Sequence, residues 1–231
     1  MISEHDQFRH LINQITERNY QCIYFDLDGT LLDEKERHFR CYCDIVKKYG
    51  GHCICIDEYW NDKRNKISRE ILLRKTGFQG SYEEYLKEWI ERIEKKEYLL
   101  YETLKPYAKS VLKTVRQYTN KLVLVTMRHN RENLLWQLNE LELKSMFDEI
   151  FIGDPIVSQK KDLLSSGNGI FEGKKLIVGD TEADEKLALN ISGDFLAVTS
   201  GLRDKKYLNG DYYMEDYGDL SNLLYTCTIK A

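Results

Sequence analysis

Residues 22–32 constrain this chain more than any other stretch. Residues 22–25 are apolar or aromatic, which is typical of a buried strand, and two carboxylates, Asp26 and Asp28, follow at once. Burying such charges costs free energy unless they have a partner, and a hard cation such as Mg²⁺ is the partner that clustered carboxylates favour. Open α/β sheets place their active sites at the carboxyl ends of their strands. The stretch therefore predicts a metal-binding site at the end of the first strand.

The composition is that of a globular protein with one domain, or with one large and one small domain. The chain has 231 residues, of which 42% are hydrophobic and 31% charged, enough to bury a sizeable core. A net charge of −4 gives no reason to expect a nucleic-acid partner. No apolar run approaches the roughly 18 residues of a membrane span. Because residues 1–6 do not read as a signal peptide, we expect a cytoplasmic monomer or homodimer whose cysteines form no disulfides.

Strand patterns are nearly absent between residues 34 and 105. Helical patterns cover residues 34–49, 57–76 and 81–98, with a short β-like run at 53–56. An insertion directly after the Asp-x-Asp strand would stand over its carboxyl end like a lid. We therefore predict a helical cap over 34–105 and a core made of 1–33 and 106–231. A helix over 3–19 would extend the core at its N-terminus.

From residue 106 onward, helical and strand patterns alternate. The strands are expected at 121–126, 149–152, 175–179 and 194–199, and the helices at 107–118, 130–141, 158–165 and 182–190. This alternation predicts an α/β fold with a doubly wound parallel sheet. The tail adds a short strand near 212–214 and a helix near 218–225.

Several of these predicted strands end in chemically useful side chains. Thr126 ends the strand 121–126, Asp180 and Asp184 follow the strand 175–179, and Lys160 and Lys161 begin the helix after 149–152. Because the carboxyl ends of parallel strands share one edge of a sheet, we expect these groups to meet.

Each group has a role in phosphoryl transfer. Asp26 can attack phosphorus and form an acyl phosphate, and Asp28 can protonate the leaving oxygen and then activate water. Asp26 and Asp180 offer oxygen ligands to Mg²⁺. A lysine, the Thr126 hydroxyl and backbone N–H groups near Gly29 can hold the phosphate oxygens.

These motifs resemble those of the haloacid dehalogenase-like hydrolase superfamily. Its D-x-D-G-T motif after a hydrophobic strand is matched by residues 25–30, its strand ending in Thr or Ser by Thr126, and its G-D-[ST]-x-x-D motif by residues 179–184. The lone lysine of its third motif is Lys160, with Lys161 as the alternative. The resemblance covers about residues 20–200, and the insert resembles the helical cap of the phosphoglycolate phosphatase and β-phosphoglucomutase branch.

The resemblance implies Asp26 as nucleophile and Asp28 as general acid and base. It also implies that Mg²⁺ binds Asp26, the carbonyl of Asp28 and Asp180, with Asp184 in support. Phosphate and substrate contacts are expected from Gly29, Thr30, Thr126, Lys160 and Arg128. Arg128 departs from the pattern, because that branch usually has Asn after the motif threonine. Arg128 either holds an anionic part of the substrate or is a solvated loop residue.

The sequence thus predicts a Mg²⁺-dependent phosphatase that acts on a small phosphorylated metabolite. A phosphomutase of the β-phosphoglucomutase type is the first alternative. A phosphonatase would need a Schiff-base lysine in the cap, for which Lys63 and Lys66 are the candidates. A non-catalytic binding protein is disfavoured because none of the motif residues is lost, and a dehalogenase is disfavoured by Asp28.

Overall fold

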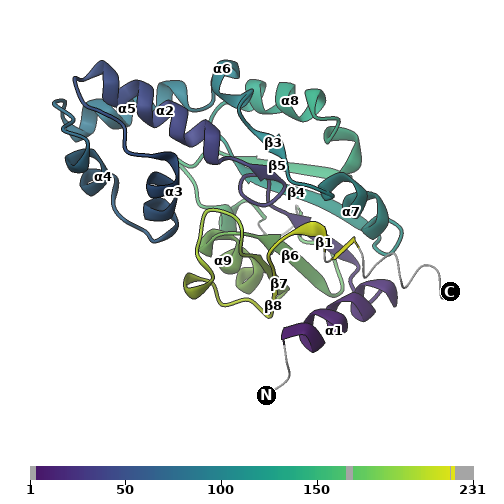
Figure 1. Cartoon of the computed structure of the whole chain (residues 1–231). Helices are drawn as coiled ribbons and strands as arrows, with labels where there is room; N and C mark the ends of the chain where they lie inside the picture. The colour runs from purple at the N-terminus through teal and green to yellow at the C-terminus, as the bar shows by residue number, and fades with distance from the viewer. Residues whose placement is uncertain (1–3, 165–168, 219, 222–231) are drawn as a thin grey trace.

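The structure, a computed structural model, describes residues 4–164, 169–218 and 220–221. Its centre is a parallel sheet with the strand order β5-β4-β1-β6-β7-β8 (Figure 1). The strands are β1 (Cys22–Phe25), β4 (Lys121–Met127), β5 (Glu149–Gly153), β6 (Lys175–Gly179), β7 (Asp194–Val198) and β8 (Tyr212–Met214). The predicted α/β fold with a parallel sheet is confirmed.

Helices cover both faces of this sheet. Ile23 and Phe25 pack in one core cluster with α1 (Glu4–Thr16), α7 (Ala108–Val115) and α8 (Arg131–Glu140). Cys22 and Tyr24 pack in another with α9 (Glu182–Asn190). Successive side chains of a strand point to opposite faces, so β1 is buried on both sides, as its unbroken apolar sequence predicts.

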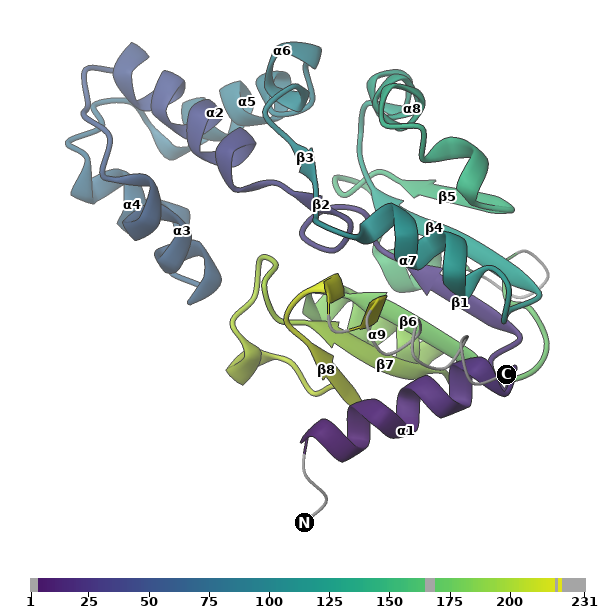
Figure 2. The ribbon, with the colours of Figure 1, turned by 45° about the vertical axis from the view of Figure 1, so that its right-hand side comes forward.

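The segment after the first strand forms a separate group of helices. These are α2 (Lys35–Lys48), α3 (Ile56–Arg64), α4 (Arg69–Lys75), α5 (Tyr82–Arg92) and α6 (Lys96–Leu99). They have a hydrophobic core of their own, which includes Tyr42, Tyr59 and Trp89. Figures 1 and 2 show them to one side of the sheet, away from α1. We call this group the cap.

The chain enters and leaves the cap through a two-stranded antiparallel ribbon. Its strands are β2 (Leu32–Asp33) and β3 (Thr103–Leu104), with Leu32 opposite Leu104 and Asp33 opposite Thr103. The sequence did not predict the ribbon, because strands of two residues are too short to show an alternating pattern. It ties the two connections between core and cap to each other.

Several predicted helices are shorter or divided. The helix expected over 57–76 is two helices, because Lys66 adopts a positive φ of 60° and Ser68 caps α4 by accepting a hydrogen bond from the N–H of Ile71. The helix expected over 81–98 divides into α5 and α6. Residues 53–56 form no strand. The helix expected at 158–165 is a single 3-10 turn, η2 (Lys160–Asp162), and most of the one at 218–225 lies outside the described residues.

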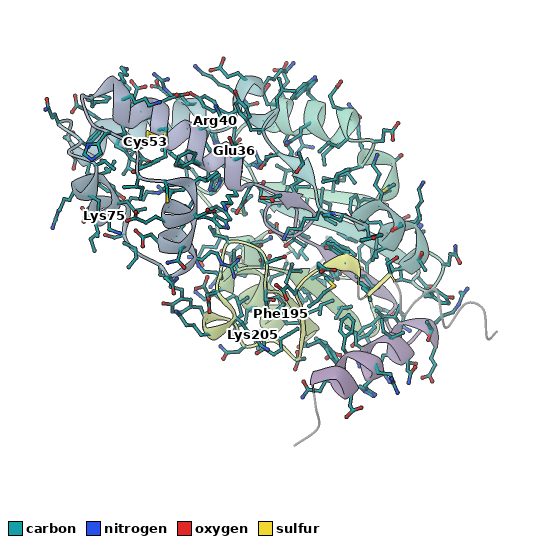
Figure 3. All side chains as sticks on the ribbon, in the orientation of Figure 1. Glu36, Arg40, Cys53, Lys75, Phe195 and Lys205 are labelled. Atoms are coloured by element: carbon teal, nitrogen blue, oxygen red, sulfur yellow. A yellow bond between two sulfur atoms is a disulfide. The ribbon has the colours of Figure 1, made fainter. Side chains whose placement is uncertain are left out.

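The prediction that the chain has no disulfides is wrong. Cys43 of α2 and Cys53 are bonded, with their Cα atoms 5.5 Å apart (Cys53 is labelled in Figure 3). The turn at Gly50 and Gly51 reverses the chain after α2 and brings the two residues together. Spacing along the sequence did not reveal this, because the contact depends on that reversal.

None of the helices in the described part of the chain combines the length and apolarity that a membrane span requires.

Candidate active site

The carboxyl ends of β1 and β6 meet around a buried lysine. The Nζ atom of Lys160 donates hydrogen bonds to Oδ1 of Asp26 and, at 2.5 Å, to Oδ1 of Asp184. All three side chains are buried. Lys161 is partly exposed, and its contact in the structure is through its carbonyl, which accepts from Asn190. Of the two candidate lysines, Lys160 is therefore the one beside the predicted nucleophile.

Three carboxylates gather at this point. Oxygen atoms of Asp26, Asp180 and Asp184 lie within 4.8 Å of one another, and all three residues are buried. Burial, together with the neighbouring carboxylates, raises the pKa of Asp26 to about 7 and that of Asp180 well above its usual range, although Lys160 opposes the shift at Asp26. When all three carboxyls are ionised, Lys160 compensates one of the three negative charges and two remain. This all-oxygen donor set and its charge fit a divalent cation such as Mg²⁺.

The loops around Asp180 are built to hold its side chain. The Oγ1 atom of Thr30 donates to Asp180 Oδ1 at 3.1 Å, and the N–H of Leu202 donates to Oδ2 at 2.6 Å. Gly29 has a φ of +70°, and a Cβ atom there would lie 2.1 Å from Asp180 Oδ2. Glycine is thus required at position 29 by both conformation and space. The hydroxyl of Thr30 donates to Asp180, and its predicted contact with substrate stays a prediction.

Asp184 is fixed by the start of α9. Its Oδ2 atom accepts hydrogen bonds from the N–H of Thr181, at 3.0 Å, and from the hydroxyl of Thr181, at 2.7 Å. This is a reciprocal capping arrangement at a helix N-terminus. The other oxygen, Oδ1, remains available for Lys160.

The Thr126 hydroxyl stands without a partner. Thr126 is fully buried at the end of β4, and its Oγ1 atom has no hydrogen-bond partner within the described residues. An orphaned buried hydroxyl is unfavourable unless a ligand satisfies it. Its position one strand away from Asp26 fits the predicted contact with a phosphate oxygen.

Asp28 is held by two arginines. Nε of Arg128 lies 2.7 Å from Asp28 Oδ2, and its NH2 atom contacts Oδ1. Arg37 of α2 adds a contact of 3.3 Å to Oδ1. Burial alone would raise the pKa of Asp28, but the two arginines outweigh it and lower this pKa to about 2. Asp28 is therefore a carboxylate in this arrangement.

Glu102 lies behind both arginines. Its carboxylate is 2.8 Å from Nε of Arg37 and 3.1 Å from NH2 of Arg128, and it accepts a 2.5 Å hydrogen bond from Gln137 of α8. Arg37 and Glu102 were not predicted, because both belong to the predicted cap and their contacts depend on where the cap docks. Arg37 follows Asp28 by nine residues in a helix of charged residues, and nothing in that pattern singles it out.

The interpretation of Arg128 as a solvated loop residue is wrong, since the residue is only 3% exposed. Within the described residues, its partners are Asp28 and Glu102. A contact with an anionic substrate stays a prediction.

A cavity of about 440 Å³ separates the cap from this part of the core. Asp28, Met127, Arg128, His129, Pro155 and Ile156 line its core side, and Glu34, Arg37, His38, Arg69, Trp89, Ile90, Ile93 and Glu94 line its cap side. We call it the Asp28 cavity. It lies beside Asp28, between the cap and the core.

Lys63 and Lys66, the candidates for a Schiff base, lie beside a neighbouring cavity of about 400 Å³. The Nζ atom of Lys63 contacts Nδ1 of His38, and that of Lys66 pairs with Glu182. Burial, together with nearby arginines, lowers the pKa of Lys63 to about 7.

Fold and site together define an α/β protein with a capped, acid-lined site suited to a divalent cation. The family model described as haloacid dehalogenase-like hydrolase matches residues 23–198. The chain belongs to this family. That match spans both the core motifs and the cap.

Individual proteins are similar to this chain in sequence or in fold. A "phosphorylated carbohydrates phosphatase" of Thermotoga maritima is 30% identical over 152 residues, which cover 62% of this chain and 65% of that protein. A predicted phosphatase from Clostridium acetobutylicum shares the fold with a TM-score of 0.67 and 18% identity, covering 90% of this chain and 99% of that one. A predicted phosphoglycolate phosphatase from Haemophilus somnus has a TM-score of 0.64 and 15% identity, covering 89% and 98%.

Proposed function

We propose that the protein is a Mg²⁺-dependent phosphatase that hydrolyses a small phosphomonoester through an aspartyl phosphate on Asp26. The main support is the buried trio of Asp26, Asp180 and Asp184 around Lys160, with its uncompensated negative charge. The orphaned hydroxyl of Thr126 adds a contact for a phosphate oxygen. The name of the relative from T. maritima supports a phosphorylated carbohydrate as the substrate class.

In this proposal, a carboxylate oxygen of Asp26 attacks phosphorus while the bond from phosphorus to the leaving oxygen breaks. A proton from Asp28 reaches that leaving oxygen. A water molecule then attacks phosphorus, Asp28 accepts its proton, and Asp26 is regenerated as inorganic phosphate forms. Lys160 and Thr126 hold phosphate oxygens throughout, which is the main contribution a protein can make to this reaction.

Asp26, the carbonyl of Asp28, Asp180 and Asp184 would hold the Mg²⁺ ion. When bound, the ion neutralises the charge that builds up on the phosphoryl oxygens and offsets their repulsion by the nucleophile.

At the start of this cycle Asp28 is ionised and carries no proton to donate. Held by Arg128 and Arg37, its carboxylate is ionised, which suits the second, base-catalysed half of the reaction. Its role as acid requires that at least one of these contacts loosens. Arg37 belongs to the cap and Arg128 to the core, so movement of the cap is the simplest way to release one of them.

The decisive experiment compares Asp26→Asn with the wild type. With Mg²⁺ and p-nitrophenyl phosphate, we expect phosphate release from the wild type and none from Asp26→Asn. Asp57→Asn, an exposed residue of α3, serves as the matched control and should retain the wild-type rate. Full activity of Asp26→Asn would refute the nucleophile, and dependence of turnover on an added sugar bisphosphate would favour a phosphomutase.

A further inference from the structure

We propose that Glu34, together with Arg37, recognises a hydroxyl group on the leaving group and makes the Asp28 cavity selective for neutral polyols. This inference rests on the proposed phosphatase function and goes further, because it assigns specificity to a residue outside the motifs. It is carried by three buried polar atoms without partners and by the charge balance of the cavity.

Glu34 is a buried carboxyl without a structural hydrogen bond. It is the N-cap residue of α2, and its carboxyl makes no capping hydrogen bond. The residue is 3% exposed. Its Oε1 atom has no hydrogen-bond partner within the described residues, and the ion-pair contact of Oε2 is a distant one of 4.0 Å to Arg37. A buried carboxyl oxygen left in this state needs a ligand to complete it.

Two donors in the same cavity are also unused. The NH1 atoms of Arg37 and Arg128 are buried without partners in the described part of the chain, although their other nitrogens contact Asp28 and Glu102. All three residues line the Asp28 cavity. One oxygen acceptor and two N–H donors that line the same cavity match a hydroxyl group, because a hydroxyl both donates and accepts hydrogen bonds.

The charges around this cavity leave no surplus for a second anion. Arg37, Arg69 and Arg128 are the arginines that line it. Lys63, which contacts His38, adds a fourth cation behind the wall. The carboxyls that face these cations are Asp28, Glu34, Glu94 and, behind Arg37 and Arg128, Glu102. His38 has a pKa well below its usual range, mainly through burial and through Lys63, and so adds no charge. Glu34 itself only adds negative charge when it ionises. A leaving group with a carboxylate or a second phosphate would therefore find its charge uncompensated.

The walls of the cavity suit the same class of ligand. Trp89 and Ile93 are largely buried residues of the cap that line it. An aromatic ring beside a few placed polar groups is a common arrangement in small-molecule sites, and C–H faces of a polyol can pack on such a ring.

The test uses three phosphomonoesters with the same three-carbon skeleton. Glycerol 3-phosphate carries hydroxyls, propyl phosphate carries none, and 3-phosphoglycerate replaces the terminal hydroxymethyl group by a carboxylate. For the wild type with Mg²⁺, we expect kcat/KM for glycerol 3-phosphate to exceed that for either of the others by at least about tenfold.

Substitutions then locate the selectivity. Glu34→Ala should bring the ratio between glycerol 3-phosphate and propyl phosphate down to within about threefold, since the unpaired partner is gone. Glu34→Gln keeps a donor and an acceptor and should retain most of the ratio. Glu36→Ala, two residues on in the same helix and paired at the surface with Arg40 (Figure 3), should leave the ratio unchanged. Thermal melting shows whether each variant is folded.

The same three ligands are titrated into Asp26→Asn by calorimetry, which measures affinity without turnover. If the wild type hydrolyses none of the esters but Asp26→Asn shows the expected order of affinities, the proposed function fails and the specificity assignment stands. If hydrolysis occurs and Glu34→Ala keeps the wild-type ratio, the assignment is overturned while the phosphatase function stands. A preference of the wild type for 3-phosphoglycerate, or none among the three esters, also overturns it.

Discussion

The guanidinium of Arg128 grips the carboxylate of Asp28 from a position 100 residues further along the chain, with Nε 2.7 Å from Oδ2. The predicted acid and base of the reaction is therefore not free at the end of its strand. Its protonation depends on a loop of β4 and, through Arg37, on the cap.

Replacing Arg128 by Ala should raise the pKa of Asp28, because burial would then be opposed by Arg37 alone. Asp28 must be ionised when it acts as the base that hydrolyses the aspartyl phosphate, so we expect the acidic limb of the pH profile of kcat to move upward by about one pH unit or more. Phosphate release from p-nitrophenyl phosphate at saturating substrate, between pH 3 and 9, measures it. Arg40→Ala, at the surface, is the control, and an unmoved acidic limb of kcat in Arg128→Ala would show that Arg128 does not set this pKa.

Lys160→Ala should reduce kcat by about a hundredfold or more, since it removes the one cation that contacts Asp26 and Asp184 among the residues the structure describes. Lys161→Ala should stay within about twofold of the wild type, because its side chain is partly solvated. Steady-state kinetics on the two variants side by side decide the matter. The reverse order would assign the phosphate contact to Lys161.

Removing the carboxylate of Glu102 should destabilise the fold. Glu102→Ala leaves Arg37 and Arg128 partly uncompensated in a buried setting, and breaking such a pair costs about 3–5 kcal/mol. Urea unfolding followed by circular dichroism gives the free energy. Glu97→Ala in α6, an exposed residue, should change it by less than about 0.5 kcal/mol. Equal effects of the two substitutions would contradict a stabilising role for the ion pairs of Glu102 with Arg37 and Arg128.

Glu34 should make stability fall as pH rises. Burial, with Asp28 nearby, raises its pKa in the folded protein from 4.5 to about 8, so between these values the folded state binds the proton more tightly than the unfolded state. Deprotonation at higher pH therefore favours unfolding. Glu34→Gln, which cannot ionise, should gain stability relative to the wild type as pH increases from 5 to 8, by at least about 1.4 kcal/mol. Denaturant titrations at several pH values measure the difference, and a constant difference would exclude a raised pKa.

Metal removal should abolish activity and lower the melting temperature. A chelator leaves the three carboxyls of Asp26, Asp180 and Asp184 without the cation. A ligand at a hundred times its Kd stabilises a fold by about 2.7 kcal/mol. Asp180→Asn should lose the rise in melting temperature on addition of Mg²⁺, whereas Asp57→Asn should keep it. Full activity after exhaustive chelation would refute the metal requirement.

The sequence was most informative where an apolar strand pattern is followed directly by reactive side chains. The strand before Asp26 and the one before Asp180 are continuous apolar runs followed by acids, so both their structure and their convergence were predictable. The boundaries of α9 and β6 agree with the expectations for the same reason.

Contacts between the cap and the core could not be predicted from the sequence. Arg37 and Glu102 are ordinary charged residues in charged segments, and their meeting with Asp28 depends on how two separately packed units dock. The Lys160 turn was expected as a longer helix, since local propensity cannot show that this lysine must reach a buried carboxylate. Breaks within the cap helices reflect single residues such as Lys66, whose backbone conformation the periodicity does not report.

The ribbon of β2 and β3 makes the cap a detachable module. Leu32 and Leu104 face each other across it, so the chain leaves the core and returns to it at points about 5 Å apart. A two-residue hairpin turn can bridge that distance. Insertions or deletions between Asp33 and Thr103 can therefore occur without stretching the sheet. Those that spare Arg37 and Glu102, which contact Asp28 and Arg128, would reshape the Asp28 cavity while Asp26 and Asp180 stay where they are.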